Sequence, residues 1–163
     1  MTTPYPLEQL LDIKKRRLEE AERVFRKKKE ILEKETNQLK KLEAERDQTL
    51  RHKQRKVEQF RQELDKGTTS DKIEIMRHYI QFIDEELKQK ETKVQTQKKR
   101  VEEAEKELKT AREVMIKKQQ EVEKLDIHKK EWEKENRALQ LHAEELETDE
   151  LGTTIHISKK YKG

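Results

Sequence analysis

The sequence predicts an all-α protein in which two long helices fold back on each other as an antiparallel coiled-coil hairpin. Three observations support this fold class. A heptad stripe of apolar residues runs through the second half of the chain, almost half of all residues are charged, and a single turn-like segment interrupts the helical pattern. Narrow apolar stripes with a heptad period are typical of coiled coils.

The heptad stripe, which we call the seam, begins at Ile73 and continues to Leu146 in alternating steps of three and four residues. All but five of its positions are apolar, although only 29% of the whole chain is hydrophobic. Disordered chains of high charge do not keep one phase over such a length. The positions are Ile73, Met76, Ile80, Ile83, Leu87, Lys90, Val94, Gln97, Val101, Ala104, Leu108, Ala111, Met115, Lys118, Val122, Leu125, Lys129, Trp132, Asn136, Leu139, Ala143 and Leu146.

Composition limits the kind of function that this chain performs. Charged residues make up 47% of 163 positions, whereas the chain holds three glycines and two prolines. This profile is typical of long helices and leaves too few apolar residues for a large globular core. Stability must then come from helix pairing, which leaves no room for an enclosed active site. We therefore expect a protein that works by contacting other proteins.

The first half of the chain carries a second stripe. Both prolines lie within residues 1–6, which predicts an extended segment there and a helical arm over residues 7–66. Near Arg46 the apolar spacing takes an extra four-residue step onto Leu50, which predicts a stutter that locally unwinds the coiled coil. The positions that recur every seven residues before it are Leu11, Leu18, Phe25, Leu32 and Leu39.

A turn is predicted between the arms, over residues 67–71. Gly67 suits a left-handed helix end. The next four residues, Thr68, Thr69, Ser70 and Asp71, are all of types that cap a helix, and Asp71 has Glu74 three residues later as a capping-box partner. The second arm then covers residues 72–148. A parallel homodimer is the competing architecture, but a turn of this composition favours a hairpin monomer.

The second arm is expected to extend past the first. In an antiparallel hairpin the numbers of facing seam residues sum to roughly 137, which places Leu7 near Trp132. No facing residue then remains for the last apolar seam positions, Leu139, Ala143 and Leu146. We interpret them as a docking end, with a frayed tip or a homodimer contact as the alternative. Residues 149–163 lie beyond the end of the seam, and we predict that they form a flexible tail.

No catalytic, metal or cofactor site is expected. Cysteine is absent, the five histidines lack metal-binding spacing, and no glycine-rich phosphate loop occurs. No apolar run could span a membrane, and no signal-peptide pattern follows the first residue. Acidic residues flank every basic run of the first arm and aromatic residues are few, so nucleic-acid binding is not expected. These basic runs are 14–17, 26–29 and 51–56.

The start of the second arm is unusual because apolar residues there lie off the seam. Tyr79 and Phe82 lie beside or outside the seam positions Ile80 and Ile83. Partly exposed aromatic residues are good anchors for an interface. Alternatively, the two rings wrap around the first arm near Phe60 and close the tip, and the sequence leaves both interpretations open.

Two short motifs, together with the layout of the chain, carry a family resemblance. One lies at the turn, as Gly67-Thr68-Thr69-Ser70-Asp71-Lys72 followed at a fixed distance by Tyr79-Ile80. The other opens the chain, as Tyr5-Pro6-Leu7-x-x-Leu10-Leu11-x-Ile13-Lys14. The chain resembles the type III secretion stalk family, called YscO in injectisomes and FliJ in flagella, and is most similar to its chlamydial members.

This resemblance implies a hairpin similar to the central stalk of rotary ATPases. Its open end would enter the hexameric secretion ATPase, and its tip would approach the cytoplasmic domain of the major export-gate protein. The needle-length regulator and secretion chaperones are further implied partners. The gate would face Met76, Tyr79, Phe82 and Ile83, and the ATPase would face Leu7, Leu10, Leu11, Leu139 and Leu146.

We therefore predict a monomeric, non-enzymatic coupling stalk of a type III secretion apparatus, with a role in virulence. It would link ATP hydrolysis in the partner hexamer to proton-driven opening of the export gate. Its expected location is the cytoplasm, peripheral to the apparatus at the inner membrane and without direct membrane insertion. The alternative function is a generic coiled-coil scaffold or adaptor with no link to secretion.

Overall fold

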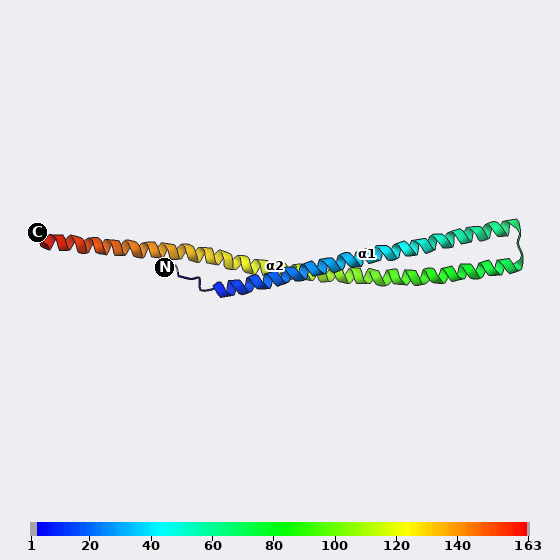
Figure 1. The fold of residues 1–163 in the computed structure, drawn as a ribbon, viewed down its shortest axis with the longest axis horizontal. Coiled ribbons are helices and arrows are strands. Elements are labelled where there is room, and N and C mark those ends of the chain that lie inside the picture. The colour runs from blue at the N-terminus through cyan, green and yellow to red at the C-terminus, as the bar shows by residue number, and fades with distance from the viewer. Residues whose placement is uncertain (1–2, 163) are drawn as a thin grey trace. The chain divides into compact units, whose positions relative to one another are not determined.

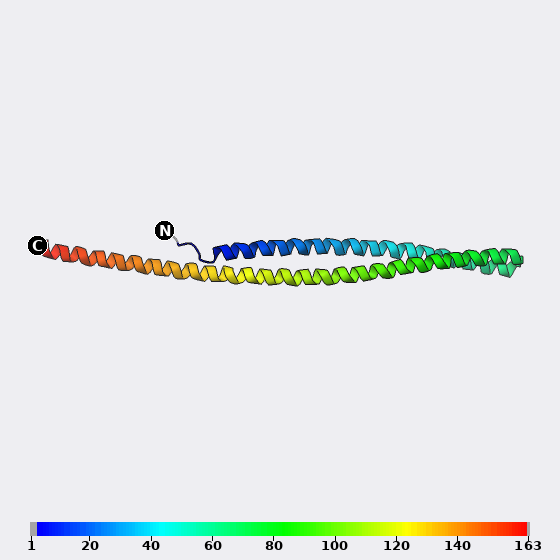
Figure 2. The same ribbon diagram turned by 90° about the horizontal axis from the view of Figure 1, so that it is seen from below.

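The computed structural model describes residues 3–162 and confirms an all-α helical hairpin (Figures 1 and 2). Helix α1 spans Glu8–Lys66, helix α2 spans Ser70–Lys162, and no strand occurs among the described residues. The chain divides into two compact units. The turn unit is Arg23–Glu113, and the terminal unit combines Met1–Glu22 with Val114–Gly163. Residues 1–2 of the predicted extended segment and residue 163 of the predicted tail lie outside the described residues.

The turn between the helices comprises residues 67–69, so α2 begins earlier than predicted. Gly67 has a φ of 80°, and its N–H donates to the carbonyl of Leu64 at 3.2 Å, which confirms the left-handed helix end. Of the four candidate capping residues, Thr69 caps α2, and Asp71 lies inside the helix. Thr69 Oγ1 accepts the N–H of Lys72 at 3.5 Å, and because this hydroxyl satisfies an end group, the residues from Ser70 onward can join the helix.

The entry to α1 is tied down by its own backbone and by one aromatic side chain. The Glu8 N–H donates to the Tyr5 carbonyl at 3.1 Å, which closes the first turn across Pro6. Tyr5 is buried, its hydroxyl forms a hydrogen bond with Nδ1 of His128, and its ring centroid lies 5.5 Å from that of Trp132. The predicted start at residue 7 is therefore accurate to one residue, and residues 3–5 are non-helical as expected.

The core of the turn unit follows the predicted seam. Each seam position of α2 in this unit, from Ile73 to Ala111, is buried or half-buried. Val94 has no exposed surface, and Ile83 is only 1% exposed. Apolar burial of this kind supplies most of the stability of a helix pair, because an isolated helix is marginal in water.

Polar seam residues of the turn unit find partners on α1. Gln97 is buried and donates its Nε2 to the Glu35 carbonyl at 2.9 Å, with a second contact to the Glu35 carboxylate. Lys90 Nζ donates to Thr49 Oγ1 at 2.7 Å. Because buried polar groups are costly when unpaired, these contacts penalise a shift of one helix along the other.

The predicted stutter near Arg46 is wrong. Thr49 is buried at the seam, whereas Leu50 is exposed. The strictly periodic α2 seam faces α1 here, so α1 keeps the matching heptad phase, and Thr49 is accommodated because Lys90 bonds its hydroxyl. The α1 positions that stay buried or half-buried in this phase are Leu39, Leu42, Arg46, Thr49, Lys53, Lys56 and Phe60.

The terminal unit pairs the beginning of α1 with the middle of α2. Leu11 is fully buried there, and Val122 packs into the same core. Lys129 Nζ lies 2.8 Å from Glu8 Oε2. The residue numbers of this ion pair, and those of Tyr5 and Trp132, sum to the predicted value near 137.

Helix α2 ends much later than predicted. Residues 149–162 continue the helix, so the expected change of secondary structure at residue 149 does not occur. Extending an existing helix needs no new nucleus, and this offsets the cost of roughly 1 kcal/mol for Gly152 in a helix interior. The hydroxyls of Thr153 and Thr154 also donate to the carbonyls one turn back, at 2.9 and 2.8 Å.

Replacing Gly67 should destabilise the hairpin. In Gly67→Ala the new Cβ meets no atom within 4 Å, so its cost comes from the left-handed backbone alone, about 1–2 kcal/mol of the free energy of unfolding. Urea unfolding followed by circular dichroism measures this loss. The matched control is Gly152→Ala, which also has open space but a helical backbone, and it should increase helix content. Equal effects of the two substitutions would contradict the assignment.

Candidate functional site

The functional features of the described residues are surfaces. Among residues 3–162 no group of histidine and carboxylate side chains is arranged to hold a metal ion. No described helix is long and apolar enough to cross a membrane. On helices this rich in charge, exposed apolar side chains that line up are the candidates for partner contact.

The first surface, the tip stripe, consists of Ile75, Tyr79 and Phe82. These residues are 69%, 44% and 64% exposed and follow one another in steps of four and three, so they form one row on the outside of α2. The two aromatic residues were expected from the sequence, whereas Ile75 was not. The off-seam spacing from Ile75 to Tyr79 was the signal that could have revealed it.

Contacts from α1 hold the Tyr79 ring in place. Its hydroxyl lies 3.0 Å from Nε2 of His52, and the Lys56 ammonium lies 5.6 Å from the ring centroid. A cation at this distance is attracted by the face of an aromatic ring. Tyr79 is thus fixed before any partner arrives, which lowers the entropy cost of binding.

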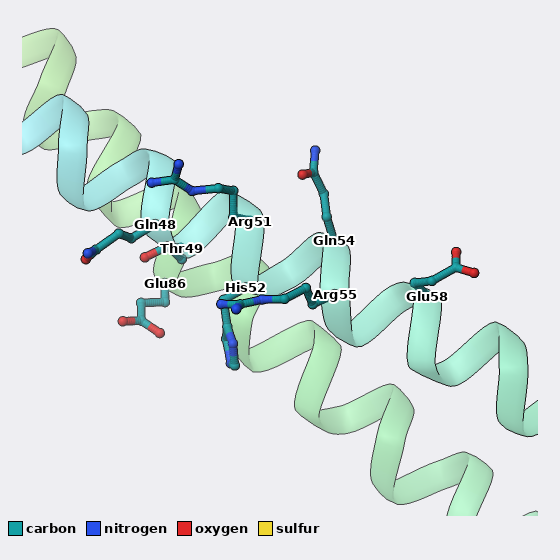
Figure 3. A pocket seen from close by; sticks show the side chains of 8 residues that line it. All are labelled: Gln48, Thr49, Arg51, His52, Gln54, Arg55, Glu58 and Glu86. Atoms are coloured by element: carbon teal, nitrogen blue, oxygen red, sulfur yellow. The ribbon is translucent and has the colours of Figure 1, made fainter.

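A shallow groove with basic residues lies close to His52 (Figure 3). Arg51 and Arg55 are exposed, and neither forms an ion pair within the described part of the chain. Figure 3 shows Arg55 extending along α1 toward His52. The residues that line the groove are Gln48, Thr49, Arg51, His52, Gln54, Arg55, Glu58 and Glu86.

The four predicted gate-facing residues differ in how far their side chains are exposed. Tyr79 and Phe82 are exposed, and Met76 is half-buried at the seam. Ile83 is buried in the core between the helices, so it is covered in the free chain. The reason is helical geometry, because Ile83 follows Ile80 by three residues and faces α1 with the rest of the seam.

The five predicted ATPase-facing residues also differ in how far their side chains are exposed. Leu7 and Leu10 are partly exposed, and Leu139 and Leu146 are widely exposed. Leu11 is fully buried in the core of the terminal unit, so it is covered in the free chain.

The second surface lies on the overhang, residues 139–161 of α2. Every residue from 141 to 161 is exposed, and both ribbon views show α2 continuing past the N-terminal end of α1 (Figures 1 and 2). Leu139, Ala143 and Leu146 form the overhang stripe, which continues the seam. Further exposed apolar residues lie off this stripe, most of them in the segment predicted to be the tail. They include Leu141, Leu151 and Ile155.

Ion pairs between the helices shift several pKa values. The Lys53 ammonium bonds Asp84 at 2.6 Å and holds the pKa of that carboxyl below its ordinary 3.8. Lys14 lowers the pKa of Glu121 below 4.5 in the same way, from 3.1 Å. The hydrogen bond to Glu8 raises the pKa of Lys129 above 10.5. Each shift favours the charged form that pairs the helices.

Comparison with known proteins was consistent with this architecture. A family model described as YscO-like protein matches residues 2–162. A solved structure described as that of a YscO homolog from Chlamydia trachomatis has 41% sequence identity to the chain and a TM-score of 0.90. The alignment covers 99% of this chain and 100% of that one. No curated protein matches the sequence.

Neighbouring residues at the turn end should differ sharply in their contribution to stability. Ile83→Ala removes a buried side chain and should lower the free energy of unfolding by about 2–5 kcal/mol. Phe82→Ala removes a side chain that is 64% exposed and should change it by less than about 0.5 kcal/mol. Urea unfolding of both variants checks this, and a large loss for Phe82→Ala would contradict its placement outside the core.

Acidification should weaken helix pairing. A carboxyl whose pKa is lowered by folding contributes stability above its unfolded-state pKa and loses it as the pH falls through the folded value. Because Asp84 and Glu121 both behave this way, the melting temperature should fall as the pH drops from about 5 to about 2. Asp84→Asn with Glu121→Gln should flatten this part of the profile in a series of melting curves. The Lys129 contribution has the opposite sign and is lost above pH 10.5.

Proposed function

The chain belongs to the YscO-like family, and on this premise we propose that it serves a type III secretion apparatus as a non-enzymatic coupling stalk. It joins the hexameric secretion ATPase to the cytoplasmic domain of the export gate. Its place is the cytoplasmic side of the inner membrane, peripheral to the apparatus. The observation that carries the proposal is the presence of two unpartnered apolar stripes on helices whose other apolar residues mostly pair with each other.

The overhang stripe is the proposed ATPase contact. Leu139 and Leu146 have no α1 residue to cover them, because α1 begins at Glu8 and its entry packs against Trp132. Leu10 adds a partly exposed apolar side chain from the first turns of α1. Two helices of one hairpin thus offer apolar side chains near both chain termini, as a protein that enters a ring of subunits requires.

The tip stripe is the proposed gate contact. Tyr79 is held in place by His52, while Ile75 and Phe82 are free to be covered by a partner. Clustered aromatic and aliphatic anchors of this kind dominate binding energy at protein interfaces. Ile83 is buried, so the proposed contact surface consists of the three exposed residues of the tip stripe.

Two matched variants test whether these stripes have separate partners. We expect Ile75→Ala/Tyr79→Ala/Phe82→Ala to reduce binding to the gate domain by at least about tenfold, and Leu139→Ala/Leu146→Ala to do the same for the ATPase. Each variant should keep its affinity for the other partner and so acts as the control for the other. Titrations with the purified gate domain and the ATPase hexamer of the same organism measure both affinities.

Size-exclusion chromatography with light scattering should show one chain per ATPase hexamer. Failure of the unaltered chain to bind either partner would reject the stalk and leave the generic scaffold. Loss of both affinities in both variants, with the helical circular dichroism spectrum retained, would reject the assignment of one stripe to each partner.

A further inference from the structure

We infer that helix α2 has two alternative ends, one at Gly152 and one at Lys162, and that the charges near these ends set the balance between them. The structure shows the longer helix, which runs to Lys162. In the shorter helix, residues 153–162 leave the helix while the hairpin stays folded. The inference is independent of the proposed function, because it uses only the chemistry of the overhang itself.

No packing against α1 holds the last turns of α2 in the helix. Every residue from 141 to 161 is exposed. Within the described part of the chain, no side-chain hydrogen bond or ion pair links residues 149–161 to α1. Because a helix without packing is marginal in water, the helix here depends on the preferences and charges of its own residues.

The preferences of the individual residues favour the shorter helix. Residues 152–158 are Gly, Thr, Thr, Ile, His, Ile and Ser, and none is Ala, Leu, Arg, Met, Lys, Gln or Glu, the types that favour a helix most. No other run of such residues in α2 is longer than three. Gly152 opens this run, and glycine readily adopts the left-handed conformation of a helix end, as Gly67 does at the end of α1. The sequence therefore provides a second place where α2 can end.

Charge favours the longer helix. In the shorter helix Glu147, Asp149 and Glu150 would lie in the last turn, where the partial negative charge of the helix end disfavours carboxylates. In the longer helix the last turn instead carries Lys159 and Lys160, which the same partial charge attracts. None of these five side chains forms an ion pair within the described residues, so their charges are not already neutralised. Residue preference and charge thus act in opposite directions.

The two forms differ in the apolar surface that the overhang presents. Leu139 and Leu146 lie before Gly152 and stay on the helix in both forms. Ile155 and Tyr161, which are 55% and 86% exposed, are presented on a helix only in the longer form. A change of charge near the helix end therefore alters this surface without disturbing the hairpin.

Hydrogen exchange of the full chain, followed residue by residue by NMR, tests the inference. The backbone N–H groups of residues 154–162 lose their helical carbonyl partners in the shorter helix, whereas those of residues 144–151 keep theirs. We expect the protection against exchange to fall by about tenfold or more in one step at Gly152. A gradual decline from residue 141 to residue 162 would indicate ordinary fraying and would overturn the inference.

Two changes should shift the balance in opposite directions. Gly152→Ala should raise the protection of residues 154–162 at least about fivefold, because alanine favours the helix interior and disfavours a left-handed end. Raising the salt concentration from about 50 to about 500 mM should lower this protection at least about twofold, since salt screens the charges that favour the longer helix.

The lysine charges have a matched control. Lys159→Gln/Lys160→Gln removes two charges from the last turn and should lower the protection of residues 154–162 at least about twofold. Lys98→Gln/Lys99→Gln removes two charges at exposed positions in the turn unit and should leave this protection unchanged.

Neutralising the carboxylates gives the decisive result. Glu147→Gln/Asp149→Asn/Glu150→Gln removes the charges that disfavour the shorter helix, so the protection of residues 154–162 should fall at least about threefold. If the carboxylates acted only by repelling one another along the helix, the same variant would raise this protection. An opposite or absent response to Gly152→Ala, to salt or to either neutralisation would overturn the inference. Unchanged protection of the turn unit confirms that each variant keeps the hairpin.

Discussion

Antiparallel pairing of α1 and α2 in one register is the constraint on which the other features of this protein depend. Burial of seam residues such as Val94 provides the stability that neither helix has alone. Polar seam residues make that pairing selective, since the amide of Gln97 reaches the Glu35 carbonyl only when the helices are correctly aligned. A slipped register would bury such groups without partners.

The register also decides which residues remain for contact with other proteins. Pairing covers Leu11 and Ile83, two apolar residues that looked suitable for partner binding. It leaves Phe82 outside the seam, and it leaves Leu139 beyond the point where α1 begins. The proposed function uses these uncovered residues, so a change in register would alter the surfaces on which it depends.

Local patterns predicted the fold well, because helices, seam and turn depend on residues close together in the chain. The phase of the α2 seam and the left-handed Gly67 were both predicted correctly. The stutter onto Leu50 was not, since an apolar side chain near the seam looks like a core residue until the facing helix is known. Thr49 occupies that position because Lys90 bonds it from across the interface.

The sequence by itself determined the helical hairpin, its approximate register and the presence of an overhang, because heptad phase and arm length are properties of the chain alone. Only the tertiary structure decided which apolar residues of each predicted site are accessible. Tyr79 and Ile83 are both apolar enough to bind a partner, yet one is held at the surface by His52 and the other is buried against α1. Exposure depends on the neighbours that pairing brings from the other helix, and these lie far away in sequence.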